Sequence, residues 1–523
     1  MTAADYAAYD CIFVKIRNEK SLLMKKTMLI TLLAISSLAL ACGNADEDFI
    51  PGPIMRPDEP AKTDSVYNDL GIELREDGDM YDTYQGLVMC GYQGWHGCPG
   101  DGSLYSQTSD PWTHYADKWS FPRVFSPGVG RNGFDFWPEV SEYEITYEAT
   151  AFTLPDGTHP RLYSAYDEST VRTHFRWMKE YGIDGVFMQR FASQIGNAVA
   201  IERSDKVLES AMKASNDYGR AICMMYDMVG LNESMTVEMM IQDIRDVSAK
   251  YNFFNREAGQ KYYLYHNGKP LIALVSIDEN INYTIADAQA IVDACQAMGF
   301  SVMVSGPTYW REGGGDCPYS TDALHALIRD ADIHTPWYVG RYDHDATAGA
   351  HGGSFDSFKE STLNPDKAWM DLNEVEFAPL CFAGYSDRNQ HPGNKVFDRA
   401  GGDFFWNQVY HNISIGNKMI YIAMFDEMDE GTAIFKCLRK SEVPGNEFHT
   451  DYYVVYEDGA YRRSTTFVEG LTGSNWCRKA SELNVTFNGI EDHLQHDHYL
   501  WLAGQARKML RGEIPMQSTQ PKR

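Results

Sequence analysis

The feature that most constrains the fold is a set of eight short, continuously apolar segments spread along the chain. Continuous rather than alternating hydrophobicity suits strands that are buried on both faces, as a parallel sheet requires. The runs are residues 86–92, 185–190, 220–227, 271–277, 300–305, 333–338, 377–382 and 419–426.

Segments with helical periodicity fill the gaps between these runs. Asp167 stands where an N-cap is expected ahead of residues 169–181. Thr284 and Asp287 have the spacing of a capping box ahead of an apolar helix that Gly299 ends. Eight strand-then-helix units with right-handed crossovers predict the α/β fold class, as a (β/α)8 TIM barrel.

Two segments depart from this alternation. Residues 93–166 follow the first strand and residues 431–496 follow the last one, and each contains turn residues between strand-like runs. We expect both to be β-hairpin insertions on the rim of the barrel, where barrel enzymes build their active sites. The barrel is then a single domain over residues 81–515, with a tail at 516–523.

The N-terminal region has the order of an export signal, at residues 1–41. Met24 is a second plausible start, which makes residues 1–23 a candidate misassigned extension, and two lysines and a short apolar run follow it. The sequence before Cys42 resembles a bacterial lipoprotein cleavage box, and the acidic residues behind it resemble the surface-export tag of Bacteroidota lipoproteins. We therefore expect an exported lipoprotein of the outer membrane or cell surface, or alternatively a periplasmic protein. Its only membrane contact would be a lipid anchor at Cys42, and residues 42–80 would form an acidic tether.

The composition and charge of the chain limit the kinds of partner and cofactor that we expect. The formal net charge of −27 repels phosphate backbones, so we expect no nucleic acid partner. Aromatic residues reach 13% of the chain, which fits either a large aromatic core or ring platforms for sugars. The absence of a CxxC pair argues against a thiolate zinc site, and no glycine-rich segment has the context of a phosphate loop, so we expect no cofactor. We expect a monomer.

The chemistry-bearing residues are expected at the strand ends, because the carboxyl end of each barrel strand faces the active site. The most polar of these ends follows the eighth run, where Asp426, Glu427, Asp429 and Glu430 place four carboxylates within five residues. Clustered like charges are costly, and such a cost is typical of functional sites. The alternative is an acidic loop that is solvated or binds a cation. Glycosidic bond cleavage needs one carboxylic acid and a second carboxylate, and Glu427 and Glu430 could supply both.

At these residues the sequence resembles a known family. The stretch Glu427-x-x-Glu430-Gly431-Thr432 is similar to the catalytic Glu-Trp-x-Glu-Gly-Thr signature of glycoside hydrolase family 99, the endo-α-1,2-mannosidases and mannanases. The stretches GYQGW (91–95), YGIDGVFMQRF (181–191) and GRAICMMYDMVG (219–230) resemble exported bacterial family 71/99-like proteins. The likeness covers about residues 84–513. Met428 replaces the tryptophan of the signature, and Asp426 replaces the preceding asparagine.

The resemblance implies a glycoside hydrolase that acts on α-linked glycans such as α-mannan-like polysaccharides or mannose-containing oligosaccharides. Glu430 would be the general acid/base. Glu427 would deprotonate the sugar 2-hydroxyl, which then attacks the anomeric carbon with net retention. The alternative from another class is a non-catalytic glycan-binding surface lipoprotein on the same barrel.

Weaker predictions concern the residues that would bind substrate. Gln189 and Arg190 could hold sugar hydroxyls, although Arg190 could equally neutralise Asp227, which is itself either a binding carboxylate or a structural partner. Three aromatic residues could stack on sugars or belong to the core. The full set of substrate-binding candidates is Tyr92, Trp95, Gln189, Arg190, Asp227, Trp310 and Asp426.

One loop could bind a metal ion. It contains Asp343-His344-Asp345 and His351, but it is rich in glycine, so a solvated loop is the preferred interpretation and we predict no metal site.

Overall fold

The computed structural model describes most of the chain beyond residue 65. The described residues are 66–76, 78–116, 125–128, 131–278, 282–345, 353–391, 394–445, 453–457, 460–479, 482–483 and 486–523. The predicted export signal, Cys42 and most of the predicted tether lie outside them. The chain divides into two compact units, Met1–Asp64 and Ser65–Arg523, and only the second is described. None of the helices in these ranges combines the length and hydrophobicity needed to cross a membrane.

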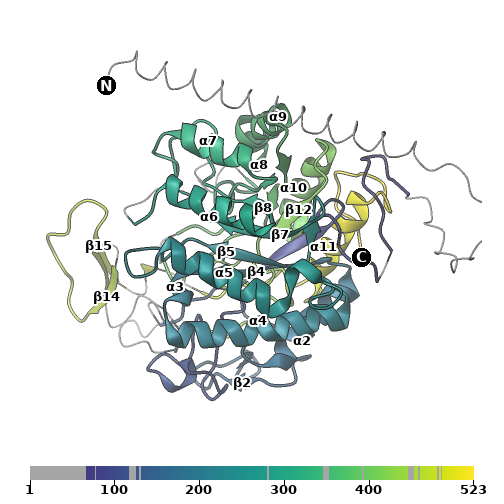
Figure 1. Cartoon of the computed structure of the whole chain (residues 1–523). Coiled ribbons are helices and arrows are strands. Elements are labelled where there is room, and N and C mark those ends of the chain that lie inside the picture. Colours follow the sequence, from purple (N-terminus) through teal and green to yellow (C-terminus); the bar gives the residue numbers. More distant parts are fainter. Residues whose placement is uncertain are drawn as a thin grey trace, which may run out of the picture. The chain divides into compact units, whose positions relative to one another are not determined.

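The centre of the second unit is one parallel sheet (Figure 1), and its strand order forms a ring that two pieces of one strand complete. Its strands run in the order β10-β9-β8-β7-β5-β4-β1-β12-β11, and the short strand β6 (Tyr265–His266) adds antiparallel to β7. All eight predicted strands are confirmed. The bounds are β1 Val88–Tyr92, β4 Gly185–Phe191, β5 Ala221–Asp227, β7 Lys269–Val275, β8 Ser301–Val304, β9 Ile333–His334, β10 Glu376–Phe377, β11 Leu380–Cys381 and β12 Ile420–Ile422.

The ring closes through β10 and β11, which are two pieces of one strand. Ala378 and Pro379 separate them, and proline has no N–H to donate to a sheet. β10 pairs in parallel with β9, and β11 pairs in parallel with β12. The seventh strand of the barrel therefore bends between its two neighbours.

Helices cover the outside of the ring, and α4 to α7 follow one another along one side in Figure 1. The predicted capping box is present, since Thr284 N–H donates to Asp287 at 2.8 Å and Asp287 N–H donates to the Thr284 hydroxyl at 3.3 Å. The main helices are α2 Glu168–Tyr181, α4 Ala198–Tyr218, α5 Val237–Tyr251, α6 Ile285–Met298, α7 Thr321–Asp330, α9 Asn364–Asn373, α10 Asp403–Ser414 and α11 His498–Leu510. Shorter pieces are α3 Ala192–Ile195, α8 Phe355–Phe358, η1 Tyr105–Gln107, η2 Phe253–Asn255, η3 Lys359–Leu363 and η4 Ala400–Gly402.

Both predicted insertions carry antiparallel strands. In the first, β2 (Tyr147–Glu148) pairs with β3 (Arg161–Leu162). In the second, β13 (Tyr453–Glu457) pairs with β14 (Ala460–Ser464) and with β15 (Trp476–Lys479). This small sheet stands away from the helical layer, at the left of Figure 1. Residues 458–459, between β13 and β14, lie outside the described residues.

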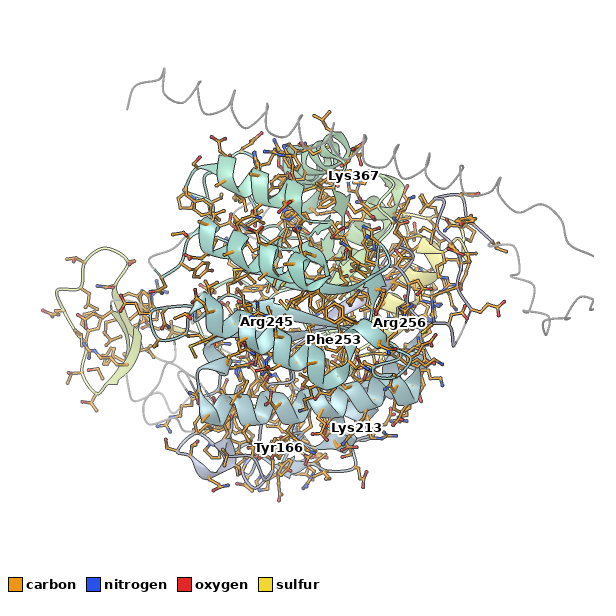
Figure 2. The ribbon with its side chains drawn as sticks, viewed as in Figure 1. Tyr166, Lys213, Arg245, Phe253, Arg256 and Lys367 are labelled. Atoms are coloured by element: carbon orange, nitrogen blue, oxygen red, sulfur yellow. The ribbon has the colours of Figure 1, made fainter. Side chains whose placement is uncertain are left out.

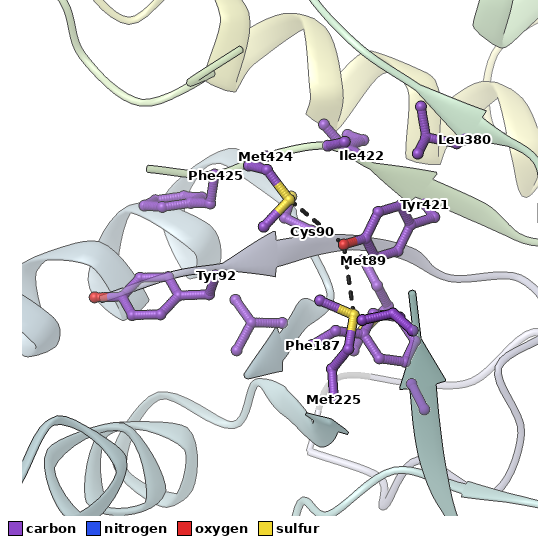
Figure 3. Packing of buried hydrophobic residues seen from close by; sticks show 14 of the residues in the cluster. Met89, Cys90, Tyr92, Phe187, Met225, Leu380, Tyr421, Ile422, Met424 and Phe425 are labelled. Atoms are coloured by element: carbon purple, nitrogen blue, oxygen red, sulfur yellow. Dashed lines mark hydrogen bonds between the residues drawn. The ribbon is translucent and has the colours of Figure 1, made fainter. Parts of the chain in front are cut away.

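The barrel interior is filled with sulfur-containing and aromatic side chains (Figure 3). The Tyr421 hydroxyl lies 3.6 Å from the Met225 sulfur and 3.4 Å from the Met424 sulfur. Gly91 faces this cluster, because a Cβ added there would lie 2.3 Å from Met424 and from the Tyr421 hydroxyl. A side chain at position 91 would therefore displace the end of Met424 or Tyr421 from this packed interior.

Chain segments outside the expected domain limits of 81 and 515 also pack on this unit. The Asn68 side-chain amide donates to the Leu510 carbonyl at 3.0 Å, and Ile72 is 1% exposed. At the other end, the Trp406 indole donates to the Gln517 carbonyl at 3.0 Å. Residues on both sides of these limits therefore contact the barrel unit. All eight cysteines in the described ranges are free thiols.

Candidate active site

One cavity of about 420 Å³ opens at the carboxyl end of the barrel. Residues at or just beyond the ends of seven of the eight strands line it, as expected where all strands run in parallel. These residues are Gln93, Gln189, Asp227, Ser276, Ser305, Trp337 and Glu427.

Glu427 and Glu430 both line this cavity. The Glu427 carboxylate accepts the backbone N–H of Asp429 at 2.9 Å and that of Glu430 at 3.3 Å. Glu427 is 4% exposed, and the Glu430 carbonyl accepts the Ser386 N–H at 2.8 Å. The turn that carries both glutamates is therefore held in place by backbone hydrogen bonds.

Asp135, from the first insertion, connects this turn to the loop after β11. Its carboxylate accepts the Ser386 hydroxyl and the N–H of Asn389, the latter at 2.9 Å. Its own N–H donates to the Met428 carbonyl at 3.1 Å. Burial raises the pKa of Asp135 to about 6. A buried carboxyl thus ties the first rim insertion to the acidic turn.

Asp227 lies at the end of β5 and faces the cavity. Its carboxylate accepts the Gln189 amide N–H at 2.8 Å and the Val229 N–H at 2.9 Å. Burial raises its pKa to about 6 against the lowering effect of these hydrogen bonds. Gln189 and Asp227 lie where a substrate could contact them, and Asp227 does not pair with Arg190.

Arg190 points away from the cavity, which corrects its predicted role. Successive residues of a strand face opposite sides, so Gln189 faces inward and Arg190 faces the helices. Arg190 forms ion pairs with Asp243 of α5 at 2.7 Å and with Asp205 of α4 at 2.8 Å. It therefore joins two helices to the barrel wall.

Tyr92 is corrected in the same way. It is 0% exposed, and its hydroxyl is 2.8 Å from Nδ1 of His174, a residue of α2. The second His174 nitrogen bonds to Tyr143 at 2.6 Å. Burial lowers the pKa of His174 to about 3. Tyr92 belongs to the packing between barrel and helix and cannot stack on a sugar.

Trp310 is also a core residue. It is 0% exposed, its indole donates to Asp366 at 3.2 Å, and its ring packs edge-on against Trp369 with centroids 4.8 Å apart. This corrects its predicted contact with substrate.

Asp426 positions another residue instead of facing substrate. It is 0% exposed and accepts the N–H groups of Gln93 and Gly94, each at 2.8 Å. Burial raises its pKa to about 6. Because Gln93 lines the cavity, Asp426 fixes the backbone that places it, and its predicted role in binding is indirect.

Trp95 is the one aromatic candidate that reaches the cavity. Its indole stacks on the His114 ring with centroids 4.0 Å apart and an angle of 8°. His114 in turn lies 2.7 Å from the Asp429 carboxylate. The Phe191 ring also lies nearly parallel to the indole, with centroids 5.8 Å apart and an angle of 18°. Two rings therefore pack against Trp95, which limits the part of the indole that a sugar could contact. His114 was not predicted, because it lies in the first insertion, far from the strand ends in sequence.

Sequence analysis also missed two residues of the cavity wall, Asp316 and Arg341. They form an ion pair at 2.8 Å, and the Arg341 Nε donates to Thr308 at 3.0 Å. Neither follows a strand closely, so only their position in space identifies them. With Asp278, they complete a wall with five carboxylates and one arginine; the carboxylates are Asp227, Asp278, Asp316, Glu427 and Glu430.

Of the loop that could bind a metal ion, Asp343, His344 and Asp345 lie within the described ranges. No group of three His, Cys, Asp or Glu side chains in the described ranges could hold a metal ion. His351 lies outside those ranges.

The fold and cavity define the class: an α/β barrel with five carboxylates and two tryptophans in a cavity at the carboxyl ends of its strands. Comparison with solved structures agrees. The family 99 endo-α-mannosidase of Bacteroides thetaiotaomicron matches with a TM-score of 0.51 and 14% identity, over 82% of this chain and 99% of that one. The fold is therefore that of the family 99 barrels.

Sequence comparison finds distant relatives of the same kind. The glycoprotein endo-α-1,2-mannosidase-like protein of Homo sapiens is 22% identical over 295 residues, which is 55% of this chain and 59% of the relative. The mouse protein of the same name is 22% identical over 296 residues, or 55% and 60%. The matched segment spans about three fifths of the length of these relatives. No family model matches the chain.

Proposed function

We propose that this protein is a glycoside hydrolase that cleaves α-linked glycans, of the α-mannan type or with mannose-containing branches. The observation that carries the proposal is the presence of Glu427 and Glu430 on the wall of one cavity at the carboxyl end of a family 99-type barrel. Hydrolysis needs two such carboxylates beside the scissile bond.

In the proposed mechanism, the Glu427 carboxylate takes the proton of the sugar 2-hydroxyl. The oxygen attacks the anomeric carbon while the glycosidic bond breaks, and Glu430 gives its proton to the leaving oxygen. Water then opens the 1,2-anhydro ring. In this step Glu430 takes a proton from the water, Glu427 returns one to the 2-oxygen, and the configuration is retained. The backbone hydrogen bonds to Glu427 support this role, because they fix its carboxylate before substrate arrives.

The remaining cavity residues would bind the sugar. Gln189 and Asp227 offer a paired amide and carboxylate for hydroxyl groups, and Trp95 offers part of its ring. Acceptors and donors of this kind suit neutral sugars.

The same hydrogen bonds favour a second candidate function. A carboxylate that accepts two N–H groups of its own turn can serve to shape that turn, and a glycan-binding protein without activity could retain it. The test is the release of reducing ends from a panel of α-mannan, α-glucan and arabinoxylan. Product from α-mannan supports the hydrolase. Binding by calorimetry without product from any substrate supports the binding protein.

We also propose that the protein is exported and carries lipid on Cys42, on the strength of its N-terminal sequence. Mass spectrometry of the membrane fraction tests this: an acylated peptide that begins at Cys42 is expected, and an unmodified N-terminus would contradict it.

A further inference from the structure

A second cavity of about 420 Å³ adjoins the one that holds the two glutamates. The two share Gln93, Trp95, Phe191 and Val229 in their walls, so they are neighbours along one cleft. We name the second one the Arg203 cavity. Its charge differs from that of the first, because none of the described residues in its wall is an aspartate or glutamate, whereas five line the first.

Arg203, on α4, is the strongest feature of this wall. It is 4% exposed, and its Nε, Nη1 and Nη2 atoms have no hydrogen-bond partner in the part of the chain that the structure describes. The guanidinium lies 5.6 Å from the centre of the Tyr105 ring. It also packs on the backbone at Gly97, where an added Cβ would lie 2.3 Å from Nη2. Arg203 is therefore a buried cation with no hydrogen-bond partner among the described residues.

The carboxylate that acts on Arg203 through its charge is hydrogen-bonded to other residues. Asp101 acts on Arg203 through its charge, but its carboxylate accepts hydrogen bonds from Ser103 and Ser164, at 2.6 and 2.7 Å. Arg190, which is equally buried, has two carboxylate partners at hydrogen-bond distance. A buried charge without a partner is costly, and a ligand that completes the pair is a physical reason to keep it.

Polar groups beside the guanidinium could hold a sugar ring. Gln194 also lines this wall, and its side-chain oxygen accepts the Phe191 N–H at 3.2 Å, which leaves its amide N–H groups for a ligand. The exposed Ser193 adds a hydroxyl. The lining thus combines one fixed cation with several neutral donors.

We propose that the Arg203 cavity is a subsite for an acidic sugar, which bears a carboxylate or a sulfate ester. Arginine presents donors in a planar fork that matches both groups. The inference deepens the proposed function and rests on it for the placement of the subsite beside the cleavage site. The substrate would be an α-linked glycan with a neutral sugar at the two glutamates and an acidic one in the adjoining position.

The test is calorimetric titration of the full chain at low ionic strength with methyl glucuronide, glucose 6-sulfate and methyl glucoside. We expect at least one anion to bind about tenfold more tightly than the neutral sugar, as one charge-assisted contact implies. The anion preferred tells a carboxylate from a sulfate. Equal binding of all three would overturn the proposal.

Variants assign the effect to this cavity. Arg203→Met should abolish the preference for the anion. Gln194→Glu keeps the acceptor for Phe191 and the size of the side chain, adds a negative charge, and should abolish the preference even if Arg203→Met does not fold. Arg245→Gln, at an exposed position on α5 (Figure 2), removes one positive charge elsewhere and should leave the preference unchanged. A preference that survives Gln194→Glu would contradict the assignment.

These measurements are independent of turnover. Hydrolysis of neutral mannan without any anion preference would refute the subsite and leave the proposed function standing. An anion preference that depends on Arg203, in a protein that cleaves no glycan, would support the subsite and refute the proposed hydrolase function.

Discussion

The side chains of Gln189 and Asp227 are joined by a 2.8 Å hydrogen bond between adjacent strands at the mouth of the barrel. The Gln189 amide donates and the Asp227 carboxylate accepts, so this hydrogen bond is strongest while Asp227 is ionised. Because burial raises the pKa of Asp227 to about 6, this contact should be sensitive to pH.

Asp227→Asn should remove that sensitivity. The folded protein holds the Asp227 proton more tightly than the unfolded chain, whose carboxyl has a pKa of about 4. The contribution of this proton to stability is therefore present below pH 4 and is lost as the pH rises through about 6. Relative to wild type, the variant should gain up to about 3 kcal/mol in unfolding free energy between pH 4 and pH 7.

The amide introduced by Asp227→Asn would find a partner, because the Gln189 side-chain oxygen has none within the described ranges and the Gln189 amide can turn over. Urea unfolding at several pH values measures the difference, with Asp69→Asn at an exposed position as the control. A difference between wild type and Asp227→Asn that does not change with pH would show that Asp227 does not titrate in this range.

Arg190→Met should destabilise the fold and spare binding. It leaves Asp205 and Asp243 without their cation, and breaking a buried ion pair in this way costs about 3 kcal/mol. Arg172→Met, which breaks an exposed pair with Asp217, should cost less than about 1 kcal/mol. Denaturant unfolding and calorimetry with a mannose oligosaccharide give both quantities. A large loss of affinity in folded Arg190→Met would mean that the residue reaches the ligand after all.

Trp95→Ala should weaken oligosaccharide binding roughly tenfold while the protein stays folded, because the indole borders both cavities and contributes ring area. Phe467→Ala removes a ring that is 54% exposed on the second insertion and should leave affinity unchanged. Equal affinity of wild type and Trp95→Ala would remove Trp95 from the binding surface.

The barrel could be predicted from sequence because each of its strands is a compact apolar run, and a run buried on both faces has no competing interpretation as a surface strand. For the same reason, the sequence does not show which side chains of a strand face the barrel interior and which face the helices. In 185–191, apolar residues on both faces leave no alternation to read, so Gln189 and Arg190 both looked like site residues, although only one of two neighbours can face inward.

The positions of residues outside the strands were still harder to predict from the sequence. The burial of Trp310 depends on Trp369 and Asp366, which lie in a helix more than 50 residues further along the chain. His114 reaches the Arg203 cavity, and Asp316 and Arg341 reach the cavity of the two glutamates, through loops whose paths depend on long-range packing. The acidic turn was the exception, because its four carboxylates lie within five residues of one another, shortly after a strand.

The most direct test of the central claim is the turnover of α-mannan by Glu430→Gln and Glu427→Gln, with substrate binding measured on the same samples. We expect kcat to fall by about 100-fold to 10,000-fold in each variant, as the loss of a general acid or base implies, while the affinity stays within a few fold of wild type. Glu257→Gln, at an exposed position, is the matched control and should retain full turnover. Undiminished turnover in either variant, with affinity preserved, would contradict the assignment of that glutamate to the chemistry.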